Sequence, residues 1–577
     1  MRARAFFLAL SVLAACRGAP HRPAPEAPAR PNVVLIMTDD QGLGDFAHAG
    51  HPALETPNLD RLARESPSVR RFYVSPVCSP TRASLMTGRW NYRTRVVDTW
   101  IGRSMMEPDE VTIAELLRPA GYATGIFGKW HLGDCYPLRP IDQGFDQALV
   151  HRGGGIAQPS EPPANERRYT DPILFRNGEE VATEGYCTDV YFDAALDFID
   201  ASLAEGRPFF AYVATNAPHG PYHDVPEELY AKYLAKGVAD REARICAMIE
   251  NIDANVGRML AHLDARGLTE NTLVVFLNDN GPAGGRYVAG LRGSKAGVHE
   301  GGIRSPLFVR WPGHLDPATV IEPIAAHVDV LPTILEAVGV PAPADLHLDG
   351  RSLLPLLAGA EPPWPERRIF LQSHRGDVPA FEHHFAVIGQ RWKLVRASGF
   401  GRHEPEADHP FELYDLIEDP GESNDLAAEL PHVVAELREA YARWFADVSG
   451  TRPDNYAPPR IVIGDTAETR TVLTRQDWRT AEGQGWGDGG AWLLEARAPT
   501  ELEVTVLFHE PQTVDRVRLH AGAAVAERGL EHAGKTLSLG VLPLPAGAFE
   551  LRVECEHEGA PVPVHQVVLQ QVKRLDG

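Results

Sequence analysis

Long hydrophobic runs are missing from most of this chain of 577 residues, and beyond residue 15 no segment is apolar for long enough to cross a membrane. Cysteine is also scarce, and six cysteines in so long a chain cannot form a disulfide framework. Positive charge is in deficit, with 56 Lys and Arg against 78 Asp and Glu and a formal net charge of −22. This balance argues against nucleic acid or an anionic membrane surface as a partner. An anionic ligand would need a local basic pocket.

What is present is an ordinary globular composition, with 44% hydrophobic and 23% charged residues and no internal repeat. The length predicts roughly two to four structural units. In an oxidising compartment Cys135 and Cys187 could form a disulfide bridge, but their spacing alone does not establish one.

The N-terminus has the layout of a secretory signal, which covers residues 1–16. Two arginines precede an apolar run over residues 5–15 that is too short to span a bilayer. The run ends in Leu-Ala-Ala-Cys, which resembles the cleavage box of bacterial lipoproteins, so that Cys16 would become a lipidated first residue. We therefore expect an exported protein of the bacterial periplasm or cell surface, anchored at Cys16; an ordinary signal peptide with an incidental cysteine is the alternative. Residues 17–31, rich in Pro and Ala, are expected to form a tether.

Residues 32–360 alternate between expected strands and expected helices. The strand segments are continuous apolar runs with β-branched residues, which is typical of strands buried on both faces of a sheet. Alternation of this kind predicts an α/β fold with a mostly parallel sheet sandwiched by helices. The expected strands are 32–37, 122–127, 209–214, 272–277 and 306–310, and the expected helices are 57–63, 111–117, 189–203 and 241–266.

The pattern changes after residue 360. Residues 361–450 are expected to form a small α+β subdomain, in which short antiparallel strands precede an amphipathic helix over 431–448. Residues 460–577 show repeated short strands separated by turn residues, with weak helical periodicity, and predict an all-β sandwich. The strands expected after residue 360 are 369–372, 384–388, 393–396, 412–414, 502–508, 514–519 and 549–553.

Oxygen-bearing side chains follow two of the expected buried strands. Asp39 and Asp40 come directly after the first strand, and Asp279 and Asn280 come directly after the strand over 272–277. The carboxyl ends of parallel strands are where open α/β sheets bind ligands. Such oxygens suit a hard cation, calcium or magnesium, and together the two strand ends favour one metal site over two solvated turns.

A cysteine motif, Cys78-Ser-Pro-Thr-Arg82, lies between these strands in the sequence. Pro80 can occupy the first turn of a helix that runs to Thr87, which would place Cys78 at a helix N-terminus. The free amides and the dipole of such a terminus attract anions. A cysteine at that position is also suited to act as a thiolate nucleophile.

Four cationic or titratable side chains lie in Gly- or Pro-rich loops, namely Lys129, His131, His219 and Lys295. Lysines can hold an anionic ester oxygen, and histidines can move protons near neutral pH. Each of them alone would be interpreted as a surface lysine or a structural histidine. Their joint occurrence on loops of the same sheet edge indicates a site.

These motifs together resemble the formylglycine-dependent sulfatases of the alkaline phosphatase superfamily, over about residues 31–450. They are NVVLIMTDDQG, VCSPTRASLMTGR, GKWHLG, NAPHGPY, LNDNG and GSKAGVHEGGIRSP, in this order. The resemblance implies that residues 32–360 are the catalytic domain. It also implies that a dedicated maturation enzyme oxidises Cys78 to formylglycine. One calcium ion would be bound by the modified residue 78 together with Asp39, Asp40, Asp279 and Asn280.

The resemblance also implies a role for each remaining residue of the site. Arg82 would support the modified side chain, and Lys129 and Lys295 would bind the sulfate group. His219 would protonate the leaving alcohol, and His131 would be the base that later releases sulfate. The implied reaction converts a sulfate ester, of a small aryl compound or a sulfated carbohydrate, to an alcohol and inorganic sulfate.

Two other functions stay open at this point. The first is a phosphonate or phosphate ester hydrolase of the same superfamily, but such enzymes often use two metals, and the acidic strand ends here suffice for one. The second is a non-catalytic glycan-binding surface lipoprotein, which would be expected to have lost Cys78, Lys129 or His219. The variable segments 133–137 and 153–155 are expected near the substrate mouth. The β domain lies outside the resemblance and is expected to brace the enzyme rather than bind carbohydrate.

Overall fold

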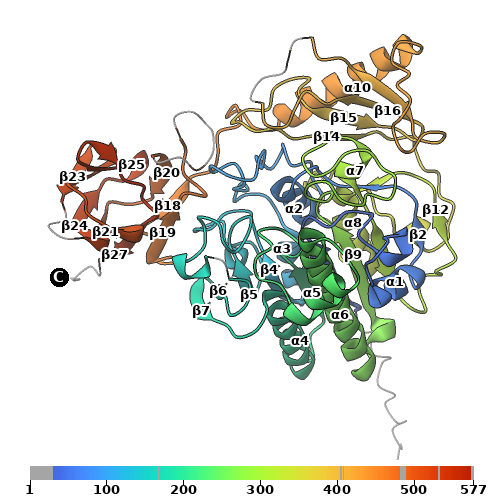
Figure 1. The fold of residues 1–577 in the computed structure, drawn as a ribbon, viewed down its shortest axis with the longest axis horizontal. Coiled ribbons are helices and arrows are strands. Elements are labelled where there is room, and N and C mark those ends of the chain that lie inside the picture. Colours follow the sequence, from blue (N-terminus) through green and yellow to red (C-terminus); the bar gives the residue numbers. More distant parts are fainter. Residues whose placement is uncertain are drawn as a thin grey trace, which may run out of the picture.

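The computed structural model describes residues 30–166, 168–402, 406, 408–480, 486, 489–529 and 533–572. The expected signal peptide, the lipid attachment site at Cys16 and most of the expected tether lie outside the described residues. No helix in the described part of the chain is long and apolar enough to cross a membrane. Figure 1 shows an α/β body, a smaller sheet with one long helix above it, and a separate β region at the left.

The α/β body is built on an eight-stranded sheet with the order β11-β9-β1-β8-β4-β5-β6-β7. The five central strands are parallel, and three antiparallel strands close the two edges. The predicted α/β fold class with a mostly parallel sheet is therefore confirmed. The parallel strands are β1 (Asn32–Thr38), β4 (Ala123–Lys129), β5 (Gln147–His151), β8 (Phe209–Ala214) and β9 (Thr272–Asn278), and the antiparallel ones are β6 (Ile173–Arg176), β7 (Glu179–Ala182) and β11 (Leu307–Arg310).

Helices cover both faces of this sheet, as the continuous apolar strands require. Alternate residues of β1 enter different cores, Val33 and Leu35 on one face and Val34 and Ile36 on the other. The first face is covered by α2 (Cys78–Thr87), α3 (Ile113–Leu117), α8 (Val330–Val338) and α9 (Leu354–Leu357). The second is covered by α1 (Pro57–Arg64), α4 (Cys187–Ala204) and α6 (Asp240–Ala265), with α5 (Glu227–Ala235) packed on α6.

Short elements join the body to its neighbours near the sheet edge. The helix α7 (Glu300–Ile303) follows the loop that carries Lys295. Five two-residue strands pair around it: β3 (Phe72–Tyr73) with β10 (Arg304–Ser305) and β13 (Ala325–Ala326), and β2 (Ser68–Val69) with β12 (Val320–Ile321).

A four-stranded antiparallel sheet with the order β14-β15-β16-β17 lies above the body and packs against α10 (Pro431–Ser449). The ring of Tyr441 on α10 stacks on Phe385 of the sheet with 3.7 Å between centroids. Lys393 joins this sheet to the body, because its ammonium group bonds Glu300 of α7 at 2.9 Å. The strands are β14 (Ile369–Gln372), β15 (Phe385–Ile388), β16 (Trp392–Arg396) and β17 (Glu412–Asp415).

The C-terminal β region consists of two sheets around one apolar core. That core also contains Met105, Cys135 and Leu138, so the β region packs against the α/β body. One sheet has the order β18 (Ile461–Ile463), β20 (Ala491–Ala496), β25 (Gly547–His557), β22 (Arg516–Ala521) and β23 (Ala524–Arg528), with β26 (Ala560–Pro561) beside β25; the other has β19 (Arg470–Thr474), β27 (Gln566–Gln571), β21 (Thr500–Gln512) and β24 (Gly534–Leu544).

Two sequence-based expectations need correction. Strands β5 to β7 and helix α5 were not expected. The strand β5 is buried but has only three consecutive apolar residues, β7 is mostly exposed, and α5 buries only Tyr233. The Cys135–Cys187 disulfide left open above is not formed. The thiol of Cys135 instead donates to the Val472 carbonyl at 3.4 Å, and that of Cys187 to Asn216 Oδ1 at 3.3 Å.

Candidate active site

The two oxygen-rich strand ends meet because β1 and β9 are neighbours in the sheet. Thr38 and Asn278 are register partners, and the Thr38 hydroxyl donates to Asn278 Oδ1 at 2.9 Å. The next residues of both strands therefore emerge side by side. The backbone N–H of Asp40 donates to Asp279 Oδ1 at 3.2 Å, and Asn280 Nδ2 donates to Asp40 Oδ1 at 2.8 Å.

Helix α2 brings the cysteine motif to the same place. Cys78 is the first residue of α2, is only 2% exposed, and starts a helix in which every residue is buried. Ligand atoms of Cys78, Asp39 and Asp279 lie within 4.8 Å of one another. Arg82 lies one turn further along and on the same face of the helix. Its guanidinium bonds Asp279 at 2.8 Å and the Lys129 carbonyl at 2.9 Å.

Two lysines neutralise the first pair of carboxylates. Lys129, the last residue of β4, donates to Asp39 Oδ2 at 2.5 Å, and Lys295 lies 2.5 Å from Asp40 Oδ1. Burial would raise the pKa of Asp40, but the charge of Lys295 and its hydrogen bond to Asp40 hold this pKa well below its usual value. Asp279 responds differently, since burial and the charge of Asp39 raise its pKa to about 7. The positive charges of the site therefore keep Asp40 ionised, but they do not offset the effect of burial and of Asp39 on Asp279.

His131 has its proton position fixed by its neighbours. Its Nε2 lies 2.8 Å from the Thr99 carbonyl, which can only accept, so Nε2 carries the hydrogen. The lone pair of Nδ1 then faces Cys78 Sγ at 3.5 Å. Burial, reinforced by Lys129, lowers the pKa of His131 well below its usual value, so the ring is neutral. A neutral imidazole with a free lone pair at position 78 can accept a proton there.

His219 approaches from the loop after β8. Its Nδ1 donates to the Gly220 carbonyl at 2.5 Å, and its Nε2 lies 3.8 Å from Asp40 Oδ2. Burial lowers the pKa of His219 to about 3, although the charge of Asp40 opposes this effect. Ligand atoms of His219, Asp39 and Asp40 lie within 4.8 Å of one another, so Nε2 is directed into the cluster.

The structure thus brings every predicted site residue into one cluster, and it adds residues that sequence reasoning missed. Arg286 bonds both the Asp40 carbonyl and Asp45 Oδ2, the latter at 3.1 Å. The Thr99 carbonyl orients His131, and Gln476 of the β region donates to that same carbonyl at 2.8 Å. A backbone carbonyl leaves no signature in a sequence, and Gln476 lies outside the motif-bearing part of the chain.

The two segments expected at the substrate mouth have different positions. The glycine run passes directly beside both histidines, because an added Cβ would lie 3.1 Å from His131 Cε1 at Gly154 and 3.3 Å from His219 Nδ1 at Gly155. The segment 133–137 lies where the α/β body meets the β region. Its Cys135 and Tyr136 are bonded to the β region, the Tyr136 carbonyl accepting from Val462 N at 3.1 Å.

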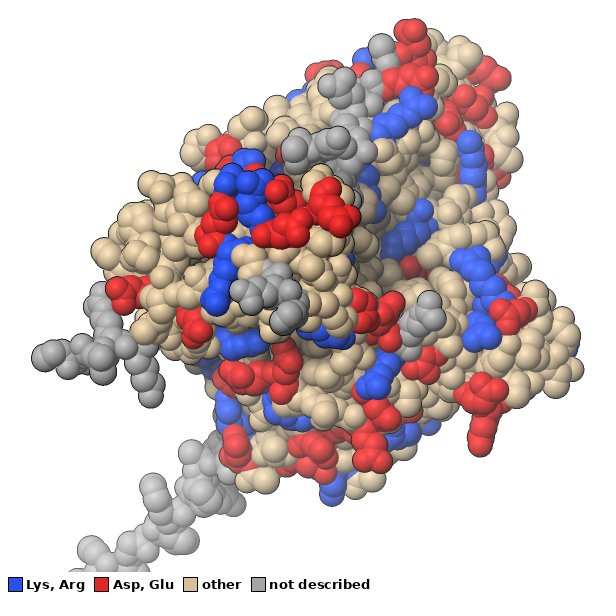
Figure 2. Space-filling view, turned by 60° about the vertical axis from the view of Figure 1, so that its left-hand side comes forward, with Lys and Arg blue, Asp and Glu red and all other residues tan. Residues whose placement is uncertain are grey.

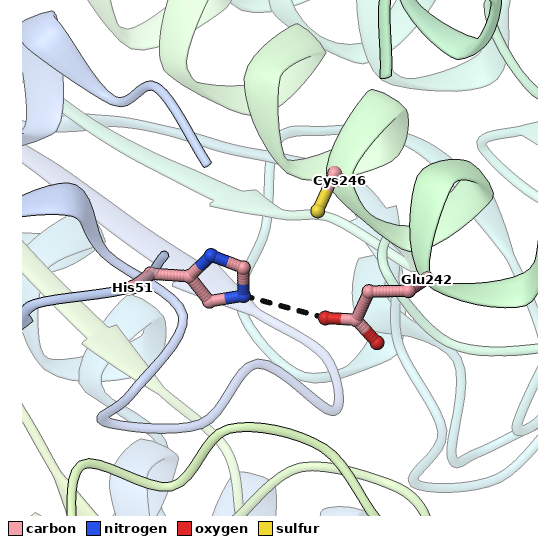
Figure 3. A group of neighbouring side chains, drawn as sticks. All are labelled: His51, Glu242 and Cys246. Carbon is pink, nitrogen blue, oxygen red and sulfur yellow. Dashed lines mark hydrogen bonds and ion pairs between the residues drawn. The ribbon is translucent and has the colours of Figure 1, made fainter. Parts of the chain in front are cut away.

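A second group of candidate ligands, His51, Glu242 and Cys246, lies in the α/β body beside α6 (Figure 3). Its hydrogen bonds argue against a metal there. His51 Nδ1 accepts from the backbone N–H groups of Leu54 at 3.0 Å and Ala53 at 3.3 Å, so Nε2 must carry the proton, and it donates to Glu242 at 3.3 Å. No lone pair of the ring is left for a cation, and burial raises the pKa of Cys246 to about 12. We interpret this group as structural.

Polar side chains are spread over the outer surface. On the face that Figure 2 shows, the described Lys and Arg residues are interspersed with Asp and Glu, without a broad basic patch. The same face is hollowed near its centre.

Comparison with known proteins gives matches over most of the described chain. Residues 31–340 match the family model Sulfatase, and residues 294–444 match N-sulphoglucosamine sulphohydrolase, C-terminal. N-acetylgalactosamine-6-sulfatase of Canis lupus familiaris is 34% identical, over 69% of this chain and 81% of the relative. Arylsulfatase A of Homo sapiens is 32% identical, over 71% and 86%.

The solved structures that match have the same fold. Ps i-CgsB in complex with k-i-k-neocarrahexaose superposes with a TM-score of 0.65 at 27% identity, over 74% of this chain and 94% of that one. PsFucS1 sulfatase from Pseudoalteromonas sp. superposes with a TM-score of 0.60 at 22% identity, over 74% and 91%, which supports the fold alone.

Proposed function

The chain belongs to the sulfatase family and is a sulfuric ester hydrolase, and we propose that it acts through a formylglycine made from Cys78 beside one bound calcium ion. The main support is the position of Cys78, whose sulfur faces a histidine lone pair at 3.5 Å and shares a cluster with Asp39 and Asp279. A thiol buried among carboxylates is a poor nucleophile, since burial raises the pKa of Cys78. Conversion to an aldehyde would remove that difficulty.

The donor set fits a hard cation. Asp39 Oδ1 and Asn280 Oδ1 are buried and have no hydrogen-bond partner, so both oxygens are free for a ligand. Asp39, Asp40, Asp279, Asn280 and the oxygen of the modified residue 78 would hold the ion. Calcium accepts such a set of carboxylate and amide oxygens. When bound, it would stabilise negative charge on residue 78 and on the sulfate group.

The remaining residues are placed to bind the anion and to move protons. A hydrated formylglycine offers one hydroxyl for attack on sulfur and a second whose deprotonation releases sulfate. His131 Nδ1 faces position 78 and would accept that second proton. His219 Nε2 would give a proton to the leaving alcohol, because a bound sulfate ester adds negative charge beside the ring and raises its pKa. Lys129 and Lys295 would exchange their present carboxylate contacts for sulfate oxygens.

The substrate is proposed by similarity. Relatives include N-acetylgalactosamine-6-sulfatase and arylsulfatase A, and one similar structure holds k-i-k-neocarrahexaose. We infer a sulfate ester of a carbohydrate or an aryl alcohol. The sequence further supports export as a lipoprotein anchored at Cys16, and maturation by an enzyme that recognises the CSPTR string.

A phosphate or phosphonate ester hydrolase is the alternative reaction within the superfamily. In the described residues the oxygen-rich ligands of the site form one compact cluster, which suits one metal better than two. Parallel assays with an aryl sulfate and the matching aryl phosphate separate the two activities. We expect faster hydrolysis of the sulfate.

The formylglycine proposal is tested by Cys78→Ala in protein produced together with its maturation enzyme. We expect loss of sulfate release with unchanged folding, while the wild-type peptide containing residue 78 shows the mass change for replacement of the thiol by an aldehyde. Cys246→Ala, which changes another buried cysteine, should keep turnover. Sulfate release by Cys78→Ala would contradict the mechanism.

A further inference from the structure

The C-terminal β region inserts a side chain into the neighbourhood of position 78. Gln476 follows β19, is only 1% exposed, and accepts a hydrogen bond on its backbone carbonyl from Gly102 N at 3.0 Å. Its side-chain Nε2 donates to the Thr99 carbonyl at 2.8 Å and lies 3.3 Å from Ser104 Oγ. The side chain is therefore enclosed by the loop that precedes α3 and by the catalytic edge of the sheet.

The orientation of the Gln476 amide follows from its partners. Trp486 Nε1 can only donate, and it lies 3.3 Å from Gln476 Oε1. The Thr99 carbonyl can only accept, and it lies against Nε2. A flipped amide would lose both bonds and place two oxygens in contact, so Nε2 is fixed as the group that faces the catalytic loop.

The Thr99 carbonyl is shared between Gln476 and His131. It accepts from His131 Nε2 at 2.8 Å and from Gln476 Nε2 at 2.8 Å, and the two nitrogens lie 3.4 Å apart. Because both nitrogens are donors, their contact is not a bond but a consequence of the shared acceptor. The amide and the imidazole thus approach the carbonyl oxygen side by side, and the bond to the amide helps to hold the carbonyl in the position that the imidazole needs.

We propose that Gln476 is a positioning residue for His131, so that the C-terminal β region completes the catalytic site. It holds the Thr99 carbonyl, the carbonyl fixes the Nε2–H tautomer and the ring plane, and Nδ1 is thereby directed at position 78. Without the amide, the carbonyl is free to turn to solvent or to Ser104, and the ring loses its anchor. This inference rests on the proposed role of His131 as a base.

The alternative explanation is that Gln476 only satisfies a buried carbonyl where the β region meets the body. Two isosteric variants separate these roles: Gln476→Met retains the volume but has no donor, and Gln476→Glu retains the shape but faces the carbonyl with oxygen. Arg479→Gln is the matched control. Arg479 also belongs to the β region and donates to the same loop, at the Ile101 carbonyl 3.1 Å away, without reaching His131.

The experiment measures kcat and KM for an aryl sulfate, the melting temperature, and crystal structures of the Gln476→Met and wild-type proteins. We expect both Gln476 variants to lose about 10- to 100-fold in kcat, with KM falling alongside it and kcat/KM nearly unchanged, because a misplaced base slows the later release of sulfate but leaves the attack on sulfur and the sulfate ligands intact. Arg479→Gln should retain the wild-type kcat. In the Gln476→Met structure the His131 ring should be turned or disordered, with Nδ1 out of reach of residue 78.

Wild-type kcat and an unmoved ring in Gln476→Met would overturn the inference. The inference would also be overturned if kcat and the melting temperature fell equally in Gln476→Met and Arg479→Gln. That result would mean that both variants only weaken the interface between the β region and the body. If the wild type itself releases no sulfate, the proposed function fails. The position of the His131 ring in the two structures then still decides the inference.

Discussion

At the scale of single residues, the two histidines of the site differ in the nitrogen that each presents. His131 is held through Nε2 and offers Nδ1 to position 78, whereas His219 is held through Nδ1 and directs Nε2 toward Asp40. Both rings are neutral in the absence of substrate, since burial lowers their pKa values. Because the two histidines are held through different ring nitrogens, His131 can accept a proton from residue 78 and His219 can donate one to the leaving group.

Replacement of His219 should therefore affect substrates according to their leaving groups. We expect His219→Ala to lower kcat/KM by about 10²- to 10⁴-fold for the sulfate ester of an aliphatic alcohol, which must be protonated as it leaves. The loss should be much smaller for 4-nitrophenyl sulfate, whose phenolate leaves without help. Lys129→Ala is the comparison, because loss of a sulfate ligand should harm both substrates alike. Equal losses for both esters in His219→Ala would rule out the acid role.

At the scale of the elements, buried ion pairs fasten the β14–β17 sheet to the body. Lys393 of β16 bonds Glu300 of α7 at 2.9 Å and Glu422 at 2.8 Å, and none of the three side chains is exposed. Glu300 also bonds Arg304 at 2.6 Å. The helix that follows the Lys295 loop is thus held by charge from two sides.

Lys393→Met should strongly destabilise the protein, because it leaves Glu422 buried without its cation and Glu300 with Arg304 alone. A broken buried pair costs about 3–5 kcal/mol. Arg391→Gln is a matched control in the neighbouring turn, where an exposed guanidinium bonds Asp415 and little loss of stability is expected. Thermal unfolding measures both. Similar melting temperatures of the two variants would show that the buried pair contributes little.

The segment that carries the glycine run also contains a buried acid. Glu161 accepts hydrogen bonds from the backbone N–H groups of Arg152 at 2.8 Å and Gly153 at 3.0 Å, and His151 lies 3.9 Å away. Burial raises the pKa of Glu161 from 4.5 to about 8, although the Gly153 bond opposes the shift. The folded protein therefore keeps a proton that the unfolded chain has already lost.

This proton gives a pH dependence with a defined sign. As the pH rises from about 4.5 to about 8, the unfolded chain binds fewer protons than the folded protein, so the free energy of unfolding falls through that window. Glu161→Gln removes this effect, and its free energy of unfolding relative to wild type should rise with pH, by an amount on the order of a few kcal/mol at pH 8. Glu166→Gln, in the same segment but exposed, should follow the wild type. A constant difference between Glu161→Gln and wild type would contradict the shifted pKa.

How much of the fold could be predicted depends on how far each element is buried. Strands β1, β8 and β9 are apolar along their centres because both faces pack on helices, and their sequence pattern predicted them within a residue or two. The hairpin β6–β7 and helix α5 have little buried surface, so their residues carry no clear periodicity. Most predicted site residues end or follow a buried strand or lie in α2, which is why motif and topology together place them, whereas Lys295 lies on the loop before α7 and was predicted from its motif.

At the scale of the whole molecule, contacts between distant parts of the chain could not be predicted. Gln476 and His131 are 345 residues apart, and contacts across the boundary bring them together, among them the packing of Met105, Cys135 and Leu138 into the β-region core. The expectation that the β region merely braces the body rested on its lack of motifs. Positioning by one amide needs no motif, so the sequence contained no signal for it.

Removal of calcium should be visible in the stability of the whole protein as well as in turnover. Three acidic side chains, Asp39, Asp40 and Asp279, are buried within one cluster, and binding of a cation to the folded state alone stabilises it by about 2.7 kcal/mol at a concentration of 100 times Kd. We expect a chelator to lower both the melting temperature and the rate of sulfate release, and added calcium to restore both. Magnesium should restore less, because it demands a tighter octahedral shell.

Asp279→Asn is the control for effects of the chelator elsewhere in the protein, because calcium should raise the melting temperature of this variant only a little. An unchanged melting temperature of the wild type after chelation, with full activity, would mean that the cluster works without the ion.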